Sequence, residues 1–353
     1  MDVEKLINYF ETSFIADLLE KENVTDISYN GKDIFYVDNR FGRLKRTTLV
    51  EPGLVKDFIR QIANLSEKQF SFQDPKLDVS FGKYRITAVH QSICRKDNLE
   101  SIAFSIRIGS TKLRIQENPE TLPKEVCDLI DVLIDSNVSI AIGGLTGSGK
   151  TELQKYMICQ MKQNTRAIVI DNILELDQLQ AKEDIDLNIW QVDEKRASAS
   201  IQELVRTALR SNPDWLIVAE SMGKEMLDVL NSALTGHPII TTLHALDLQS
   251  MPHRMVRMVM MNEQKMNFRD VYQDIAYHIR FYFYLKRKYL SNGNVSRYIS
   301  SIAYLNGDKM EEIYSSSDGL KKKYGLLSKN ALALLDLSNA SNLFKRTFLG
   351  GEQ

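Results

Sequence analysis

Gly144-Leu145-Thr146-Gly147-Ser148-Gly149-Lys150-Thr151 is the stretch of this chain that decides its fold. It matches the pattern G-x-x-x-x-G-K-[ST], with an apolar run over 138–142 before it and a helical segment after it. Glycines in such a loop let backbone N–H groups wrap phosphate oxygens at the start of a helix, where the helix dipole favours negative charge. The spacing therefore predicts a phosphate-binding loop between a strand and a helix.

This loop predicts a nucleotide site in which Lys150 and Thr151 have different roles. Lys150 is expected to supply charge to the β- and γ-phosphates, and the Thr151 hydroxyl is expected to bind Mg²⁺. The expected nucleotide contacts in this segment are Gly144, Thr146, Gly147, Ser148, Gly149, Lys150, Thr151 and Glu152.

Polar residues follow three more predicted strands, at 167–170, 215–219 and 239–243. They are Asp171, Glu220 and His244. The carboxyl ends of parallel strands meet at one edge of a sheet, which is where open α/β sheets bind their ligands. A lone acid after a strand is usually a loop or cap residue, but three polar residues beside a P-loop favour function. Glu220 is the leading candidate to orient water for in-line attack and to assist Thr151 at the metal.

The hydrophobic pattern divides the chain into two predicted domains. Residues 1–110 predict a small α+β domain with an N-terminal amphipathic helix, a hairpin turn at Asn30-Gly31, a helix over 52–65 and alternating strands over 84–89 and 102–108. Residues 111–123 are typical of a linker. From 124 to 353, strands alternate with helices as in a mostly parallel sheet, followed by an antiparallel addition over 278–305 with a turn at Asn292-Gly293 and helix over 327–347.

Composition limits the function classes. The 353 residues carry 45 Lys+Arg and 46 Asp+Glu, and this net charge of -1 excludes the broad basic field of a protein that coats duplex nucleic acid. The three cysteines, Cys94, Cys127 and Cys159, lie far apart and predict neither a disulfide framework nor a zinc site, which favours a reducing cytoplasm. Because no run of about eighteen apolar residues occurs, any membrane association is expected to be peripheral.

Several polar features have plain structural explanations when taken alone. Arg85 and Arg107 alternate with apolar residues in their strands, and the pattern by itself favours solvated side chains. His237, in Thr235-Gly236-His237-Pro238, is explained by a turn. The methionines between 251 and 261 are most simply core residues, and the basic residues between 280 and 325 a solvated face.

Taken together, these motifs resemble the type II and type IV secretion ATPases, also called traffic ATPases. Residues 171–176 resemble the aspartate box of that family, and residues 204–214 resemble the segment that leads into its Walker B strand. Val218-Ala219-Glu220 occupies the Walker B position, and residues 235–245 are similar to the histidine box. The order and spacing of all four motifs, including the P-loop, fit the family.

The resemblance implies a RecA-like P-loop NTPase C-terminal domain behind a smaller, PAS-like N-terminal domain. It also implies a homo-hexameric ring that binds ATP and Mg²⁺ between the two domains. The implied catalytic set is Lys150, Asp171, Glu175, Glu220 and His244. The implied further contacts to the nucleotide or to a neighbouring subunit are Arg85, Arg107, Arg206, Arg210 and His237.

Three of the motifs depart from the family pattern. Met222 stands where the family usually has an arginine, two residues after Glu220. Asp171-Asn172 replaces the usual Glu-Asp, and Ile239 replaces a glycine. The departure at Met222 bears on rate and on signalling between subunits, because methionine cannot replace the bidentate hydrogen bonding of a guanidinium.

The sequence therefore predicts an ATP-hydrolysing cytoplasmic motor of a type IV secretion, conjugation or pilus-assembly machine, docked on inner-membrane components. The short N-terminal domain and the lack of a four-cysteine insert resemble this branch more than the type II assembly ATPases. One alternative is a ring helicase or nucleic-acid translocase, against which stand the near-neutral charge and the lack of an evident DNA-binding motif. The other is a catalytically weak scaffold that binds nucleotide, suggested by Met222 and Asn172.

Overall fold

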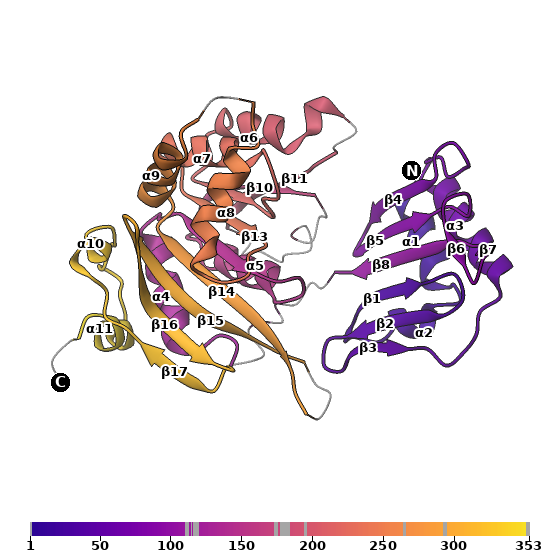
Figure 1. Ribbon diagram of the computed structural model, residues 1–353, viewed down its shortest axis with the longest axis horizontal. Helices are drawn as coiled ribbons and strands as arrows, with labels where there is room; N and C mark the ends of the chain where they lie inside the picture. Colours follow the sequence, from indigo (N-terminus) through magenta and orange to yellow (C-terminus); the bar gives the residue numbers. More distant parts are fainter. Residues whose placement is uncertain are drawn as a thin grey trace. The chain divides into compact units, whose positions relative to one another are not determined.

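The computed structural model describes residues 2–109, 113, 115, 120–172, 176, 184–193, 196–263, 266–291 and 295–350. It divides into two compact units (Figure 1). Unit 1 comprises residues 1–110 together with Tyr289–Ser296, and unit 2 comprises residues 111–288 and 297–353. The segment Tyr289–Ser296, which lies within the range 124–353 expected for the second domain, thus groups with the first. Most of the expected linker at 111–123 and the Asn292-Gly293 turn lie outside the described residues.

Unit 1 is a six-stranded antiparallel sheet with helices on one face, in the strand order β3-β2-β1-β8-β5-β4 (Figure 1). Its elements are α1 (Val3–Glu11), α2 (Ala16–Leu19), β1 (Val24–Tyr29), β2 (Ile34–Asp38), β3 (Gly42–Lys45), α3 (Pro52–Leu65), β4 (Lys76–Phe81), β5 (Tyr84–Val89), β6 (Arg95–Lys96), β7 (Leu99–Glu100) and β8 (Ala103–Ile108). Side chains such as Phe10, Phe58 and Ile106 form one buried core between helices and sheet. The expected α+β fold is confirmed.

The N-terminal amphipathic helix is interrupted, which the apolar spacing did not predict. It ends as α1 at Glu11 and resumes as the single turn α2. The hydroxyls of Thr12 and Ser13 donate to the carbonyls of Asn8 and Phe10, at 2.8 and 2.7 Å. Such side-chain hydrogen bonds compete with the helical ladder and favour a turn.

Unit 2 is built on a nine-stranded sheet in the order β11-β10-β12-β13-β9-β14-β15-β16-β17. The pairs from β11 to β14 are parallel. Its strands are β9 (Ile140–Gly144), β10 (Arg166–Asp171), β11 (Asp186–Gln191), β12 (Trp215–Val218), β13 (Ile239–Leu243), β14 (Phe281–Tyr289), β15 (Val295–Asn306), β16 (Lys309–Ser317) and β17 (Lys321–Tyr324). The predicted α/β class with a mostly parallel sheet is confirmed.

Helices cover both faces of this sheet (Figure 1). They are α4 (Lys124–Asp135), α5 (Lys150–Cys159), η2 (Ala197–Ala199), α6 (Ile201–Leu209), α7 (Met226–Leu234), α8 (Ser250–Val259), α9 (Phe268–His278), α10 (Lys329–Leu332) and α11 (Asn342–Phe348). Helices α4, α5 and α11 share one apolar cluster with the sheet, and α6 to α9 share the other. Because both faces are covered, the central strands β9, β12 and β13 are buried along their whole length and are mainly apolar.

Three expectations for unit 2 need correction. The parallel edge strand β11 was not predicted. The antiparallel addition begins only at β15, because β14 pairs in parallel with β9. The helical range 327–347 contains only the short helices α10 and α11, with residues 333–341 between them. Of the methionines expected in the core, Met251, Met255 and Met258 are buried, whereas Met260 and Met261 are exposed.

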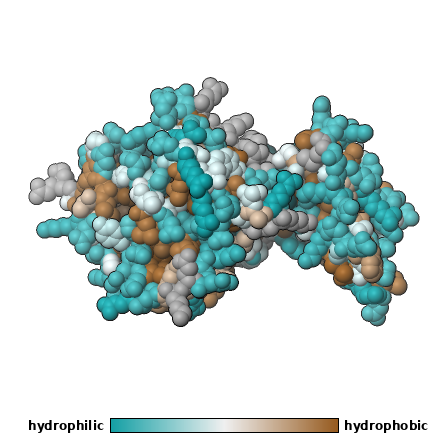
Figure 2. Space-filling model, turned by 90° about the horizontal axis from the view of Figure 1, so that it is seen from above, coloured by the Kyte–Doolittle hydropathy of each residue, from teal (hydrophilic) through white to brown (hydrophobic). Residues whose placement is uncertain are grey.

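The surface is mainly polar. Hydrophilic residues cover most of the face that Figure 2 displays, and apolar side chains appear there in separate patches. Within the described residues, no helix is both long enough and apolar enough to cross a membrane.

Candidate functional site

The loop between β9 and α5 has the backbone that its glycines predict. Gly147 and Gly149 have φ values of 72° and 100°, which glycine adopts without strain. Gly144 has no room for a side chain, since a Cβ there would lie 2.6 Å from the carbonyl oxygen of Leu285. Gly149 is the N-cap of α5, so the first N–H groups of that helix point into the loop. The loop is therefore a preformed anion cradle of the P-loop type.

Lys150 lies at the centre of this cradle and is 8% exposed. Its ammonium group donates to the carbonyl oxygens of Gly144 and Leu145, at 3.1 and 3.3 Å. It also lies 3.4 Å from Nδ1 of His244, which follows β13. The structure thus brings the P-loop lysine and the residue after β13 together at the sheet edge.

Glu220, which follows β12, meets the other side of the same imidazole. The distance from His244 Nε2 to Glu220 Oε1 is 2.7 Å, which makes an ion pair when the histidine is protonated. The glutamate side chain is 26% exposed, and its Oε1 is buried. One imidazole thus connects the P-loop cation to the carboxylate expected to orient water.

The backbone on either side of Glu220 is fixed to β13. The Thr242 hydroxyl donates to the Ala219 carbonyl at 2.7 Å, and the Ser221 N–H donates to the Thr242 carbonyl at 2.8 Å. The Ser221 and Thr241 hydroxyls lie 2.8 Å apart. Glu220 follows β12 and His244 follows β13, and these two strands pair in parallel, so the sheet edge holds Glu220 beside His244.

Gln154 is a residue that the sequence analysis missed. It lies on α5, is fully buried, and its Nε2 donates to the carbonyls of Val218 and Ile240, at 3.2 and 3.4 Å. It therefore ties the P-loop helix to the two strands that carry Glu220 and His244. The available signal was a polar residue one turn after Lys150, on the same side of the helix as the apolar residues Met157 and Ile158.

The remaining P-loop residues lie where the motif places them. Thr151 is half-buried in the first turn of α5, and Thr146 is exposed at the loop tip. The Glu152 carboxylate lies 3.2 Å from the Lys155 ammonium, so it forms an ion pair on its own helix. Ser148 is buried, and its hydroxyl has no hydrogen-bond partner within the described residues.

The aspartate box is described only in part. Asp171 is buried at the end of β10, and its Oδ2 accepts from the Leu176 N–H at 3.1 Å. In the strand order, β10 is separated from β9 by β12 and β13. Asp171 therefore holds its own loop, three strand spacings or about 14 Å from the P-loop strand. Glu175 lies outside the described residues.

Three residues implied by the resemblance are not brought to the P-loop of their own chain. His237 precedes β13, at the opposite end of that strand from His244, and its Nδ1 lies 3.1 Å from the Thr235 hydroxyl. Arg206 pairs with Asp228 at 3.1 Å, and that carboxylate raises the pKa of the guanidinium. Arg210 is exposed after α6, in the turn that enters the amino end of β12.

Arg85 and Arg107 lie directly opposite each other on β5 and β8 of unit 1. They stand on the face of the sheet away from the helices, and Arg107 Nε is 3.4 Å from an oxygen of Asp26 in β1. Like charges in register on neighbouring strands repel each other. Arg85 therefore stands beside the Arg107–Asp26 ion pair on this face of unit 1.

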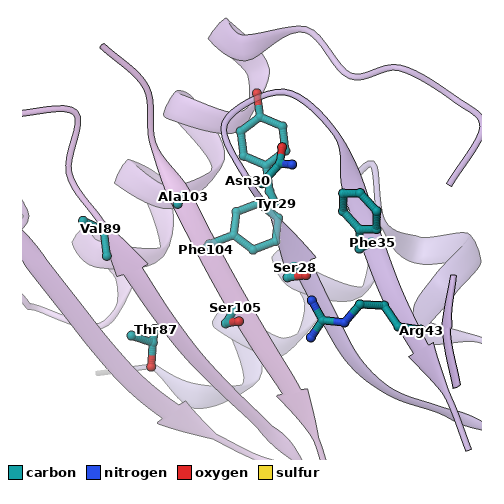
Figure 3. Close-up of a pocket in the computed structure, with 10 residues that line it drawn as sticks. All are labelled: Ser28, Tyr29, Asn30, Phe35, Arg43, Thr87, Val89, Ala103, Phe104 and Ser105. Atoms are coloured by element: carbon teal, nitrogen blue, oxygen red, sulfur yellow. The ribbon is translucent and has the colours of Figure 1, made fainter. Parts of the chain in front are cut away.

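A shallow pocket of about 430 Å³ lies on the same face (Figure 3). Ser28, Ser105 and Thr87 are cross-strand neighbours in it, and Phe35 and Arg43 stand at its side. The hydroxyl row is two residues along the strands from the row of Arg107 and Arg85. The pocket contains no residue of the P-loop unit.

Met222, which replaces the arginine usual in the family, is 50% exposed after Glu220. Its loop is held by the buried carboxylate of Glu225, which accepts from the Gly223 N–H at 2.8 Å. Arg254 of α8 reaches the Met222 carbonyl with one guanidinium nitrogen, at 3.4 Å. Within the described residues, no group of three or more His, Cys, Asp or Glu side chains could hold a metal ion alone.

Comparisons with known proteins agree with this geometry. Residues 106–275 match the model of the family described as type II/IV secretion system protein. An uncharacterised protein of Bacillus anthracis is 28% identical over 295 residues, which cover 81% of this chain and 65% of the relative. The type IV secretion system protein PtlH of Bordetella pertussis is 31% identical over 38% of this chain and 40% of its own length. The chain thus spans less than two thirds of either relative.

The fold also matches a solved structure. The ATPase DotB of Legionella pneumophila superposes with a TM-score of 0.62 at 19% identity, covering 87% of this chain and 82% of that one. Its similarity supports the α/β architecture described above. Residues 106–275, which include the P-loop, Glu220 and His244 at one sheet edge, thus carry a type II/IV secretion system protein domain.

Proposed function

We propose that this protein is a Mg²⁺-dependent ATPase whose hydrolysis drives a type IV secretion, conjugation or pilus-assembly machine. The observation that carries the proposal is the connected series Lys150, His244 and Glu220 at the N-terminus of α5. It places a cation for phosphate, an imidazole and a carboxylate at one point of the sheet edge.

The loop fits a nucleotide polyphosphate. Gly144 lets the loop pass close to the Leu285 carbonyl, where a side chain has no room, and the buried Ser148 hydroxyl offers one more polar group inside the loop. Lys150 now donates to two carbonyl oxygens of its own loop. When the N–H groups of the loop bind a phosphate, the Lys150 ammonium group would donate to phosphate oxygens in place of these carbonyls. A charge-assisted hydrogen bond to phosphate is roughly twice as strong as one to a neutral carbonyl.

The first turn of α5 suits Mg²⁺ as well. Mg²⁺ usually keeps several water molecules and is held by one or two protein oxygens together with substrate phosphates. The Thr151 hydroxyl would hold the ion, with Glu220 near it, and the ion would neutralise charge on the phosphate oxygens when bound. This donor set is consistent with the lack of an all-protein metal cluster within the described part of the chain.

Glu220 would orient the attacking water. Its backbone is fixed to β13 on both sides, so the carboxylate can be held in one position during the reaction. His244 contacts both Glu220 and Lys150, so it would hold the Glu220 carboxylate in position. It would also respond to phosphate binding, because a bound phosphate would move the Lys150 ammonium group.

We assign Arg85 and Arg107 as the anion-binding residues of unit 1.

The transport role is supported by the relatives, one of which is a type IV secretion system protein. A homo-hexameric ring at inner-membrane components is part of the proposal, as is a cytoplasmic location. Turnover in such a ring would be converted into movement of one unit against another.

Nucleotide binding provides the first test. Isothermal calorimetry with ADP and Mg²⁺ should give saturable binding to the full chain and none to Lys150→Ala. The matched control is Lys162→Ala, since Lys162 is an exposed lysine that pairs with Asp135 away from the loop. Equal binding by wild type and Lys150→Ala would contradict the assignment of the site.

A further inference from the structure

Two arginines from the C-terminal part of unit 2 lie against the P-loop. The Nε of Arg297, on β15, donates to the Gly147 carbonyl at 2.9 Å. The Nη1 of Arg287, on β14, lies 2.9 Å from the point where a Cβ on Gly147 would be. The Arg297 side chain also passes 3.8 Å from the corresponding point on Gly149. Neither arginine belongs to the set that the motifs predict.

The sheet register explains why both side chains reach this place. Leu285 of β14 pairs with Gly144 at the end of β9, so β14 continues past the end of β9 alongside the P-loop. Arg287, two residues on, points to the same face as Leu285. Leu285 packs in the cluster that contains Leu153 of α5, so this is the face on which the P-loop helix lies.

The same reasoning holds for β15. Arg297 is two residues before Ile299, which belongs to the α5-side cluster. Both guanidinium groups therefore lie on the α5 side of the sheet, at the end where α5 begins.

Arg287, Arg297, Lys150 and the positive end of the α5 dipole thus all bring positive charge close to the loop. A polyphosphate bound in this loop would place its negative charge close to these cations, which attract it. The N–H of the same peptide, on Ser148, donates to the Leu145 carbonyl at 3.2 Å, so the Arg297 contact to the Gly147 carbonyl and this turn hydrogen bond together fix the tip of the loop.

We propose that Arg287 and Arg297 are further residues of the nucleotide site, acting on the phosphates from within the same chain. Arg297 is a positioning residue, which fixes the Gly147 peptide. Arg287 supplies charge to the polyphosphate and is replaceable by another cation. This inference rests on the proposed function of the P-loop as a nucleotide site.

The test compares variants of the full chain in calorimetric titrations with ADP and with inorganic pyrophosphate. Arg287→Gln and Arg297→Gln should each weaken both ligands by about tenfold, the loss typical of one charge-assisted hydrogen bond. Arg287→Lys should restore binding, whereas Arg297→Lys should not, because the amine cannot reproduce the Nε contact to Gly147. The matched control is Lys286→Gln, whose side chain lies on the other face, over the Tyr284 ring.

Four outcomes separate the claims. Wild-type protein that binds neither ligand would overturn the proposed function, and this inference with it. Tight wild-type binding that both Arg→Gln variants retain would overturn only the inference. A loss for ADP but not for pyrophosphate would also overturn it, by assigning the arginines to the nucleoside. A loss of affinity in the Arg→Gln variants no greater than that in Lys286→Gln would also overturn the inference. Thermal melting without ligand shows whether each variant is folded.

Discussion

Glu220 is the residue on which hydrolysis depends in this account, because its carboxylate lies 2.7 Å from His244 and its backbone is fixed on both sides. Glu220→Gln keeps the shape of the side chain and removes its charge. We expect ATP binding to persist and turnover to fall by about a hundredfold or more, the range lost with a positioned acid or base. Steady-state phosphate release together with calorimetry measures both.

The control for that experiment is Glu203→Gln, which removes an equal charge from the surface of α6 at a pair with Arg206. Its turnover should equal that of the wild type. If Glu220→Gln hydrolyses ATP as fast as Glu203→Gln, then Glu220 does not orient the water.

Glu220 and His244 could be predicted from sequence because each follows an apolar run that ends at the same sheet edge. Gln154, Arg287 and Arg297 could not. Their roles depend on which strand lies beside which, and the pairing of β14 with β9 joins residues about 140 apart in the chain. The local pattern around them is that of an ordinary helix or strand.

At the scale of elements, Gln154 joins α5 to β12 and β13. Gln154→Leu would keep the volume and remove both hydrogen bonds, leaving two strand carbonyls without that donor. We expect the free energy of unfolding to fall by about 1–3 kcal/mol, measured by urea denaturation. Gln160→Leu is the control, because Gln160 is half-buried and reaches only the Tyr156 carbonyl, at 3.4 Å. Equal losses in the two variants would contradict the role of Gln154.

The β9 end offers a second test at this scale. Gly144→Ala would place a Cβ 2.6 Å from the Leu285 carbonyl, at a φ of 153°. Gly307→Ala also changes a glycine of positive φ, 59°, but nothing lies within 4 Å of its Cβ. We expect about 1 kcal/mol of destabilisation for Gly307→Ala and about 3 kcal/mol for Gly144→Ala, by the same denaturation. If Gly144→Ala destabilises the protein no more than Gly307→Ala does, the end of β9 can shift to accommodate the Cβ, which would contradict this expectation.

Elements were predicted well where one residue pattern decides them. The helix over 52–65 and the strand over 239–243 form as expected, since each has an unbroken period and clear ends. The edge strand β11 was missed because its residues are only partly buried and carry weak apolar alternation. β14 was assigned to an antiparallel addition because pairing direction is decided by distant neighbours.

At the scale of the whole molecule, the proposal requires a ring. Light scattering after gel filtration should show a hexamer that is favoured by a non-hydrolysable ATP analogue with Mg²⁺. The analogue should have no effect on Lys150→Ala, since that variant lacks the phosphate contact. A monomer at all protein concentrations, with and without the analogue, would contradict the ring.

The measurement that tests the central claim most directly is steady-state phosphate release from Mg²⁺-ATP by the purified full chain, compared with Lys150→Ala. Turnover by the wild type that is lost in Lys150→Ala and retained in Lys162→Ala is the predicted result, because only Lys150 lies in the cradle beside His244. Wild-type release no faster than that of Lys150→Ala would contradict an ATPase and favour a scaffold that only binds nucleotide.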